Sequence, residues 1–356
     1  LLSKCEELLF EIPSWLSAFL LAKWEQLCDH WRKVFSLAFI CLYWVICPIC
    51  SISIPSYLLF TSLQNYAIGY LIFSATFTYL TRNLPERGGL PTEWCRRVWP
   101  WPVIRDYFSH TIVKTAELPP DRNYLIGSHP HGILHVGGTL TFAGKVSGFN
   151  DLFPGLDQCI TTIQGQFRWP YRREFMILVG VNSITPESID YLLNNPGQGR
   201  AVALVIGGVS EALVARPGKY DLKIKNRKGF VRQALIHGAD LVPCYHFGEV
   251  DLFDHDRGID EKGLKNMQAR IRNIIGFFPP FLRGASIFGC GLRGLLPFQR
   301  PITSVIGAPI RVSRNEQPSE AEVDALHDEY CAALSDLFDK HKHRHGIPED
   351  AHITFF

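Results

Sequence analysis

The chain has 356 residues, of which 47% are hydrophobic, and its formal net charge is only +2. This length suits one large domain or two. The apolar content excludes a disordered chain, and the small net charge excludes an obvious nucleic-acid binder. Ten cysteines are scattered along the chain rather than arranged as a disulfide framework. That usage favours reduced thiols in a protein that faces the cytosol.

Residues 1–33 interleave large apolar side chains with charged ones, as in Trp15, Phe19 and Trp24 beside Lys23. This pattern is typical of an amphipathic helix at a membrane interface. A soluble helix packed on the domain has the same pattern, and the sequence leaves both interpretations open.

Residues 34–81 contain no charged residue and no histidine. The run is too long for one membrane span and fits two helices of roughly 20 residues each. Prolines and serines in residues 48–56 favour a turn there, with Gln64-Asn65 as the alternative. We therefore predict a membrane-embedded helical hairpin with both ends cytosolic, because basic residues flank it on each side. A buried apolar helical pair in a soluble core is the competing interpretation.

Residues 82–356 are expected to form a cytosol-facing α/β domain. Strand-like and helical patterns alternate, which favours a largely parallel sheet with flanking helices. Residues 85–120, rich in Trp, Arg and Pro, suit a chain that emerges at the headgroup level of a membrane. A capping box at Ser319 and Glu322 predicts the start of the last helix. The predicted strands are 123–127, 158–163, 176–180, 201–206, 241–247 and 302–306.

The segment His129-Pro130-His131-Gly132 follows the first of these strands directly. Open α/β sheets place their ligand crevice at the carboxyl ends of the strands, and histidine is the commonest general base near neutral pH. Residues two apart in an extended segment point to opposite faces, so His129 and His131 are expected to differ in role. The alternative is that these are two histidines of a polar loop without a catalytic role. A zinc site at His131 and His135 is disfavoured, because Gly132 stands where the HExxH signature needs Glu.

The same four residues resemble the HPHG signature of the type-2 diacylglycerol acyltransferase family, which includes the monoacylglycerol and wax-alcohol acyltransferases. One short motif would be weak evidence, but further blocks agree in the same order. The resemblance runs from about residue 30 to the C-terminus. The other blocks are Pro91-Thr92-Glu93-Trp94, Gly207-Gly208-Val209-Ser210-Glu211, Arg227-Lys228-Gly229-Phe230-Val231-Arg232 and His246-Phe247-Gly248-Glu249.

This resemblance implies an enzyme of the endoplasmic reticulum membrane and of lipid droplets, with a glycerolipid-acyltransferase-like fold. Its expected reaction moves a fatty acyl group from acyl-CoA, the co-substrate, to the hydroxyl of a neutral glycerolipid. Diacylglycerol is the leading acceptor, with monoacylglycerol or a long-chain alcohol as alternatives. Neither a metal nor another cofactor is required. The bilayer is an expected partner, nucleic acid is not, and a homo-oligomer is compatible with these expectations.

In the expected mechanism His131 takes the proton of the acceptor hydroxyl as that oxygen attacks the thioester carbonyl. His129 supports the loop or holds a substrate. Main-chain N–H groups near Gly132 or Gly207-Gly208 would stabilise the oxyanion, because a glycine pair after a buried strand can present such donors. A covalent acyl-enzyme is not needed.

A carboxylate partner for the base is expected at Glu211. Related glycerolipid phosphate acyltransferases have an Asp four residues after the histidine, but here those positions hold no acid. Glu211 follows the glycine pair and is our candidate for orienting a protonated His131. A surface Glu that caps the next helix is the alternative.

The densest basic cluster contains Arg227, Lys228, Gly229 and Arg232. Arginine and lysine beside a glycine suit the phosphates of acyl-CoA. A solvated face, or contact with anionic lipid headgroups, fits the cluster equally well.

Two other interpretations compete with the transferase. Ser210 follows a strand as the nucleophile of a membrane serine hydrolase would, but Ala212 replaces the last glycine of GxSxG. A non-catalytic lipid-binding scaffold is the third interpretation. A GxGxxG match at residues 289–294 is rejected as a dinucleotide site, because Pro297 follows it and no clear βαβ unit surrounds it.

Overall fold

The computed structural model of the chain describes residues 14–41, 47–98, 100–194, 199–255, 282–285 and 296–356. Its centre is a seven-stranded sheet with the strand order β1-β10-β7-β2-β5-β3-β4. The five strands from β7 to β4 are mutually parallel, whereas β10 runs antiparallel to β7 and parallel to β1. The predicted, largely parallel α/β sheet is confirmed.

The seven strands are β1 (Thr111–Lys114), β2 (Tyr124–His129), β3 (Asp157–Thr162), β4 (Val181–Ser183), β5 (Arg200–Leu204), β7 (Asp240–Phe247) and β10 (Thr303–Ile306). Two short pairs lie outside this sheet: β6 (Asp221–Leu222) with β11 (Thr354–Phe355), and β8 (Asp254–His255) with β9 (Leu282–Arg283). The helices of the domain are α5 (Glu93–Arg97), α6 (Trp101–Tyr107), α7 (Val136–Gly138), α8 (Phe149–Leu152), α9 (Arg172–Val179), α10 (Pro186–Asn194), α11 (Gly208–Ala212), α12 (Gly229–His237) and α14 (Glu320–His341). A π-helix, η3 (Thr139–Ala143), follows α7, and short 3-10 turns are η2 (Leu84–Glu86), η4 (Gln164–Arg168), η5 (Glu249–Asp251) and η6 (Lys342–His345).

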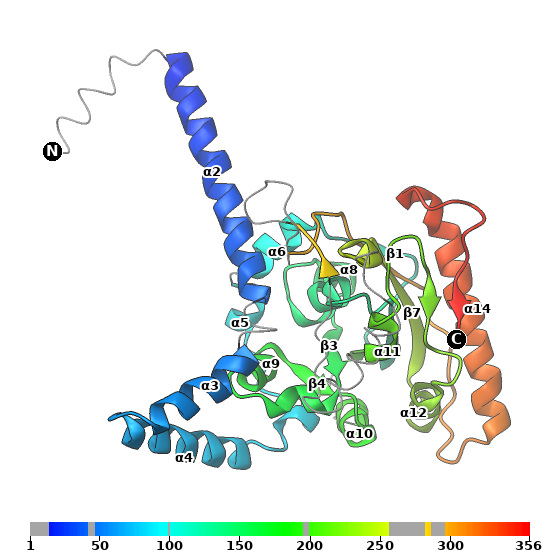
Figure 1. The fold of residues 1–356 in the computed structure, drawn as a ribbon. Coiled ribbons are helices and arrows are strands. Elements are labelled where there is room, and N and C mark those ends of the chain that lie inside the picture. The colour runs from blue at the N-terminus through cyan, green and yellow to red at the C-terminus, as the bar shows by residue number, and fades with distance from the viewer. Residues whose placement is uncertain (1–13, 42–46, 99, 195–198, 256–281, 286–295) are drawn as a thin grey trace.

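Alternate side chains of the strands build one hydrophobic layer on each face of the sheet. Leu125 of β2 packs into the layer that α10, α12 and α14 complete. Tyr124 and Ile126 pack into the opposite layer, which contains side chains of α6, α8 and η3. Figure 1 shows α12 and α14 along one side of the sheet. The central strand β2 is buried over its whole length because both layers cover it.

The carboxyl end of β2 lies at a change of direction in the sheet. The connection that leaves β2 leads past β5 to β3, whereas the connection that leaves β5 leads past β2 to β7. Open α/β sheets form their ligand crevice where successive connections diverge in this way. The end of β2 is therefore where the topology alone places a binding site.

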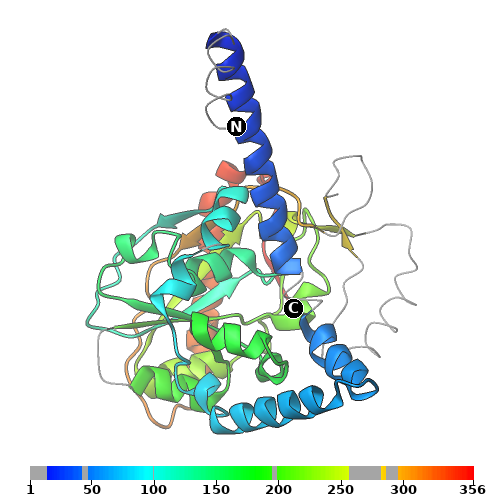
Figure 2. The same cartoon turned by 90° about the vertical axis from the view of Figure 1, so that its left-hand side faces the viewer.

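The N-terminal helices project from this body. Figures 1 and 2 show α2 (Ser14–Cys41) as a long helix that extends away from the sheet, with α3 (Cys47–Leu59) and α4 (Gln64–Leu80) at its other end. The helices α3 and α4 pack against each other. Among the described residues, no helix combines the length and the hydropathy that crossing a membrane requires.

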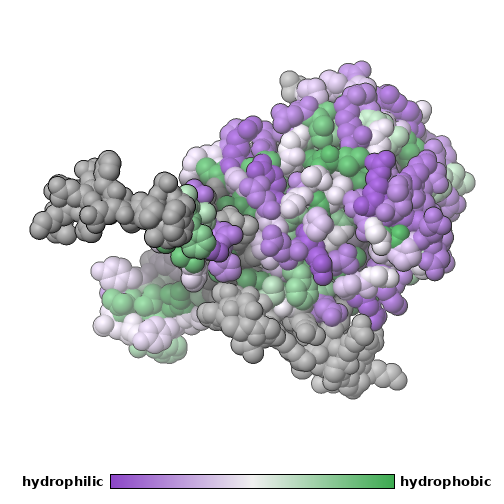
Figure 3. Space-filling model, turned by 90° about the horizontal axis from the view of Figure 1, so that it is seen from above, coloured by the Kyte–Doolittle hydropathy of each residue, from purple (hydrophilic) through white to green (hydrophobic). Residues whose placement is uncertain are grey.

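The surface of α3, α4 and their turn is strongly apolar. Figure 3 shows hydrophobic residues, in green, gathered on the part that projects beside the main body. Phe60, in the turn, is 91% exposed. Large apolar side chains that are more than half exposed here are Ile52, Ile54, Tyr57, Phe60, Tyr66, Ile72, Phe73, Tyr79 and Leu80. Such a patch is unusually large for a surface in contact with water alone.

Two expectations about the N-terminal region were wrong in detail. The favoured turn at residues 48–56 lies inside α3, and the chain turns at residues 60–63, just before Gln64-Asn65. Within residues 85–120, which were expected at the headgroup level, the side chains of Trp101 and Arg96 are instead buried in the domain. The Arg96 guanidinium donates to the carbonyls of Ala143, Phe142 and Gln158 at 2.8, 3.2 and 3.0 Å, which ties α5 to the sheet.

Five of the six predicted strands are confirmed, and the predicted capping box of Ser319 with Glu322 begins α14. Residues 176–180 are an exception, because they form the end of α9 and its Gly180 cap. A short apolar run does not distinguish a strand from a buried helix, and here the run continues the helical turn begun at Arg172. The short strands β1 and β4 had no sequence signal that we used.

Candidate active site

The two histidines of the loop leave the end of β2 on different sides. His129 is the last residue of the strand and is fully buried, whereas His131 is partly exposed. A cis peptide bond joins His129 to Pro130, and Gly132 has a positive φ of 54°. The two imidazoles thus differ in their surroundings, as expected.

His129 faces the layer that contains α14. Its Nε2 lies 3.2 Å from the hydroxyl of Tyr330, and in the described part of the chain its Nδ1 has no hydrogen-bond partner. Gly127 permits this approach, because a Cβ there would overlap the Tyr330 hydroxyl. Burial lowers the pKa of His129 to about 3, so this imidazole is neutral.

His131 is held by main-chain contacts on both sides. Its own N–H donates to Glu211 Oε1, and its Nδ1 lies 3.0 Å from the carbonyl oxygen of Gly132. Because a carbonyl only accepts, Nδ1 of the neutral ring must carry the proton, and Nε2 is left as the acceptor. Burial of the surroundings holds the pKa of His131 below its ordinary value. The ring is therefore in the tautomer that a general base needs.

Glu211, in α11, is almost fully buried and connects this helix to two other segments. One carboxylate oxygen accepts the His131 N–H, and the other accepts the N–H of Lys223 at 3.1 Å. Gly207 packs so closely on this carboxylate that a Cβ would overlap it. Burial raises the pKa of Glu211 to about 7. The contact differs from the expected one, because the carboxylate holds the backbone of His131 rather than its ring.

Gly132 and Gly208 bring main-chain donors to the same loops. Gly208 has a positive φ of 60° and begins α11, and a Cβ there would meet no atom within 4 Å. Gly132 lies against the side chain of Glu249, where a Cβ would approach Cγ to 2.6 Å. In the described part of the chain, neither N–H donates to an acceptor. Both glycines thus have an available donor, but only Gly208 has open space beside its Cα.

A second buried carboxylate, Glu249, was missed as a functional residue. It accepts the N–H groups of Val136 and Gly137 at 2.9 and 2.8 Å, and so caps the first turn of α7. Burial raises its pKa to about 7. The sequence shows Glu249 only as part of a family block. Nothing local indicates that it reaches a loop more than 110 residues away.

The basic cluster lies at the start of α12, and its cations differ in availability. Lys228 Nζ lies 2.6 Å from Asp324, and an Arg232 nitrogen lies 2.6 Å from Glu320, so both side chains pair with α14. Arg227 is exposed, and among the described residues it forms no ion pair. Gly229 is the first residue of α12 and is exposed as well. Lys228 and Arg232, two of the predicted phosphate ligands, therefore also connect the start of α12 to α14.

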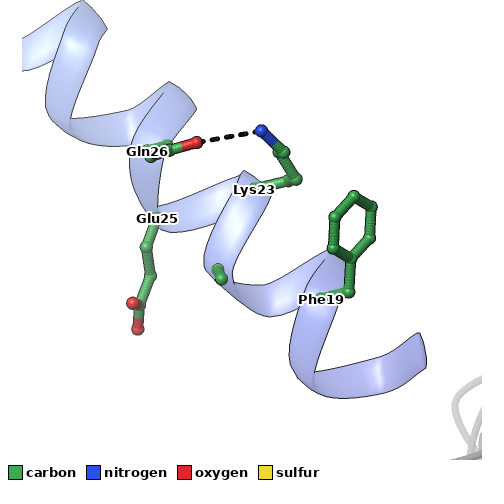
Figure 4. A pocket seen from close by; sticks show the side chains of 5 residues that line it. Phe19, Lys23, Glu25 and Gln26 are labelled. Carbon is green, nitrogen blue, oxygen red and sulfur yellow. Dashed lines mark hydrogen bonds between the residues drawn. The ribbon is translucent and has the colours of Figure 1, made fainter. Parts of the chain in front are cut away.

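The other candidate sites have little support. No imidazole lies within hydrogen-bond distance of the Ser210 hydroxyl among the described residues, although a serine hydrolase needs an adjacent base. In the same part of the chain, no group of three His, Cys, Asp or Glu side chains is arranged to hold a metal ion. The GxGxxG match at residues 289–294 lies outside the described residues. Figure 4 shows a shallow hollow on α2 whose lining residues, Phe19 and Lys23 among them, all belong to that one helix, far in sequence from the histidine loop.

Comparison with known proteins identifies the family. Human 2-acylglycerol O-acyltransferase 3 is 41% identical over 84% of this chain and 86% of its own length. Human acyl-CoA wax alcohol acyltransferase 1 is 38% identical over 96% of this chain and 98% of its own. Human diacylglycerol O-acyltransferase 2 is 40% identical over 79% and 73%. A solved 1-acyl-sn-glycerophosphate acyltransferase from Thermotoga maritima is similar over 87% of this chain and 97% of its own, but at 12% identity and a TM-score of 0.38 it is too distant to inform the site.

A family model described as diacylglycerol acyltransferase matches residues 57–356, which contain every candidate catalytic residue. The relatives share one class of reaction, O-acyl transfer, although their names differ in the acceptor. The chain belongs to the diacylglycerol acyltransferase family.

Proposed function

We propose that this protein transfers a fatty acyl group from acyl-CoA to the hydroxyl of a neutral glycerolipid, with diacylglycerol as acceptor and triacylglycerol as product. The observation that carries the proposal is the state of His131. Its Nδ1–H is engaged by the Gly132 carbonyl, so Nε2 is an acceptor at the end of β2. A neutral imidazole with a free Nε2 can remove a proton from a hydroxyl group.

The mechanism has two steps: the acceptor hydroxyl attacks the thioester, and the tetrahedral intermediate then breaks down. His131 Nε2 takes the hydroxyl proton while that oxygen forms a bond to the thioester carbon, and the carbonyl oxygen gains the charge. The N–H groups of Gly132 and of Gly207-Gly208 stabilise this oxyanion. The carbonyl then re-forms as the C–S bond breaks, and the imidazolium returns its proton to the departing CoA thiolate. Glu211 holds the His131 backbone during both steps and offsets the charge of the imidazolium.

The CoA phosphates bind near the start of α12 in this scheme. Arg227 and Gly229 are exposed there, and the first turn of a helix offers main-chain donors to an anion. Lys228 and Arg232 add positive charge from positions fixed by their carboxylate partners on α14. Arg227 is expected to contribute most to binding the CoA phosphates, because its guanidinium need not first leave a carboxylate partner.

The apolar pair α3–α4 embeds in the endoplasmic reticulum membrane or on a lipid droplet, with both of its ends cytosolic. Its exposed side chains, such as Phe60 and Phe73, support this placement because burial in lipid would stabilise each by about 1.5–3 kcal/mol. A neutral acceptor dissolved in a bilayer does not diffuse through water, so a membrane-attached enzyme meets it where it is. Flotation of the protein with liposomes, and its loss when Phe60 and Phe73 become Asp, would test this attachment.

The reaction is tested in microsomes of a host that lacks neutral-lipid synthesis. Labelled oleoyl-CoA is offered with diacylglycerol, monoacylglycerol or a long-chain alcohol, to wild type and to His131→Ala. We expect label in triacylglycerol with the wild type alone. Label in diacylglycerol or wax ester instead would keep the chemistry and change the acceptor. Free fatty acid as the sole product, lost in Ser210→Ala, would establish the hydrolase, and no turnover with any acceptor would refute an acyltransferase.

A further inference from the structure

A line of buried polar side chains runs from β10 across the sheet to the His131 loop. Each neighbouring pair is within 2.9 Å, and none of these residues was a candidate catalytic residue in the sequence. The line lies on the face opposite His129 and Tyr330. In order, its contacts are His110 Nε2 to Ser304 Oγ at 2.9 Å, Ser304 Oγ to His246 Nδ1 at 2.7 Å, His246 Nε2 to Ser128 Oγ at 2.7 Å, and Ser128 Oγ to His135 Nε2 at 2.9 Å.

The contact of His135 at one end of the line determines which atoms of Ser128, His246 and Ser304 donate and which accept. His135 Nδ1 lies 3.1 Å from the carbonyl oxygen of Pro130, and a carbonyl only accepts, so Nδ1 carries the proton. Nε2 of the neutral His135 ring is then an acceptor, and the Ser128 hydroxyl must donate to it. Since a serine has a single proton, Ser128 Oγ can only accept from His246. His246 therefore carries its proton on Nε2.

The same counting continues toward β10. His246 Nδ1 is an acceptor, so Ser304 must donate its hydroxyl proton to it. Ser304 Oγ then accepts from His110 Nε2 or from the Thr141 hydroxyl, which lies 3.0 Å from it. His110 Nδ1 has no hydrogen-bond partner among the described residues. Burial lowers the pKa values of His110 and His135 to about 4 and about 3, and that of His246 well below its ordinary value. These imidazoles are thus neutral, as the assignment of hydrogen-bond donors and acceptors along the line requires.

The backbone of α7 is shaped around this line. A Cβ at Gly137 would lie 2.8–2.9 Å from the His246 ring, and a Cβ at Gly138 would overlap the His135 ring. The glycine pair therefore lets both imidazoles pack directly on the helix. His135 itself has a positive φ of 54°, which is uncommon for a residue with a side chain. A strained residue and two close glycines indicate that the surrounding contacts determine this arrangement.

We infer that His246 is a positioning residue for His131, acting through Ser128 and His135 on the carbonyl of Pro130. The inference rests on the proposed function, because His131 is the base whose position matters. Pro130 directly precedes His131, so a shift of its carbonyl rotates the backbone that carries the base. A displacement of about 1 Å can reduce the rate of a reaction by about 100-fold.

Two substitutions of His246 separate the hydrogen bond from the volume. His246→Leu fills the space without a donor, and His246→Gln retains an N–H that can reach Ser128. We expect kcat to fall about 10- to 100-fold in His246→Leu, with KM for oleoyl-CoA unchanged, and to recover to within about threefold of wild type in His246→Gln. The matched control is His327→Leu. His327 is also buried, but it contacts the Ile224 carbonyl at 3.1 Å, outside the line.

A double-mutant cycle tests whether the effect travels through Ser128. Residues that act as a unit are not additive, so His246→Leu should lower kcat in the wild-type background but not in Ser128→Ala. If the two losses multiply instead, His246 does not act through Ser128, and the inference is overturned. Equal losses of kcat in His246→Leu and His327→Leu would overturn it too, because both would then reflect general destabilisation.

A readout that needs no activity separates this inference from the proposed function. In the purified, histidine-labelled protein, imidazole 15N shifts should show the Nε2–H tautomer for His246 and the Nδ1–H tautomer for His135, and Ser128→Ala should change both. The opposite tautomer at His246 would refute the line. Full activity of His131→Ala would instead refute the base assignment, while leaving the tautomers as stated.

Discussion

His129 and His131 are separated by a single proline, yet the two sides of the sheet give them different surroundings. On the α14 side, His129 is fully buried and its Nε2 contacts the Tyr330 hydroxyl. On the other side, His131 is partly exposed and its ring is oriented by the Gly132 carbonyl. The first arrangement can stabilise the end of β2, whereas only the second leaves an acceptor nitrogen that a substrate can approach.

The two buried carboxylates of the site, Glu211 and Glu249, support the loop rather than the imidazole of the base. Glu211 and Glu249 accept hydrogen bonds from main-chain N–H groups on either side of Gly132, and among the described side chains neither is hydrogen-bonded to an imidazole ring. The base is thus positioned through its backbone from several directions, by two acids and by the carbonyl of Pro130. Removing a support should therefore reduce the rate by less than removing the base itself.

The largest expected effect on kcat comes from replacing the base, and replacing the other histidine of the motif should mainly affect stability. His131→Ala should lower kcat about 10²- to 10⁴-fold with little change in thermal unfolding, because it removes proton transfer from a partly exposed ring. His129→Ala should mainly destabilise the protein, by about 2–4 kcal/mol, since it leaves a cavity and an unpaired Tyr330 hydroxyl. Rates and unfolding midpoints of both variants are measured in the same detergent. A His129→Ala enzyme that folds normally but is inactive would reverse the assignment.

The next effect concerns Glu211. In Glu211→Ala two partly buried N–H groups, of His131 and Lys223, lose their acceptor, at up to about 1–3 kcal/mol each. We expect kcat to fall about 10- to 100-fold, with a smaller loss in Glu211→Gln, which keeps one acceptor.

Glu93→Gln is the control for these measurements, because its carboxylate is exposed and pairs with Arg97 and Lys145 far from the loop in sequence. Equal activity of Glu211→Ala and wild type would show that the backbone contact is dispensable.

A smaller effect distinguishes the cations of α12. Arg227→Ala should raise KM for acyl-CoA about 3- to 10-fold and weaken its dependence on salt, since an exposed guanidinium loses a phosphate contact. Lys228→Ala should change KM less, because that ammonium is already paired with Asp324. Arg314→Ala, which breaks an exposed pair with Glu316, is the control. The same KM in all four proteins would exclude the cluster as the CoA site.

The smallest effect is a displacement of the pH profile. Burial holds the pKa of His131 below its ordinary value of 6.5, so the deprotonated base persists as the pH falls through 6.5. The acid limb of kcat/KM should therefore lie below pH 6.5. Burial raises the pKa of Glu211 to about 7, so a limb near pH 7 that disappears in Glu211→Gln would point to this carboxyl group instead.

Local patterns were sufficient for much of the fold. The apolar run before His129 and the capping box at Ser319 each act within a few residues, and the structure contains both features. The apolar run at residues 176–180 was misread as a strand because its length is compatible with both states. The turn before α4 was misplaced because Pro48 and Pro55 fall inside α3.

The sequence by itself determined the family, the parallel α/β layout and the two histidines at the end of a strand, because each depends on a contiguous motif or a short period. Only the tertiary structure decided which histidine can act as a base and what holds it. His246 and Glu249 reach the loop across more than 110 residues, and the register of β2 with β7 brings them there. A hydrogen-bonded line of this kind has no sequence period, since each member is set by strand pairing rather than by its neighbours along the chain.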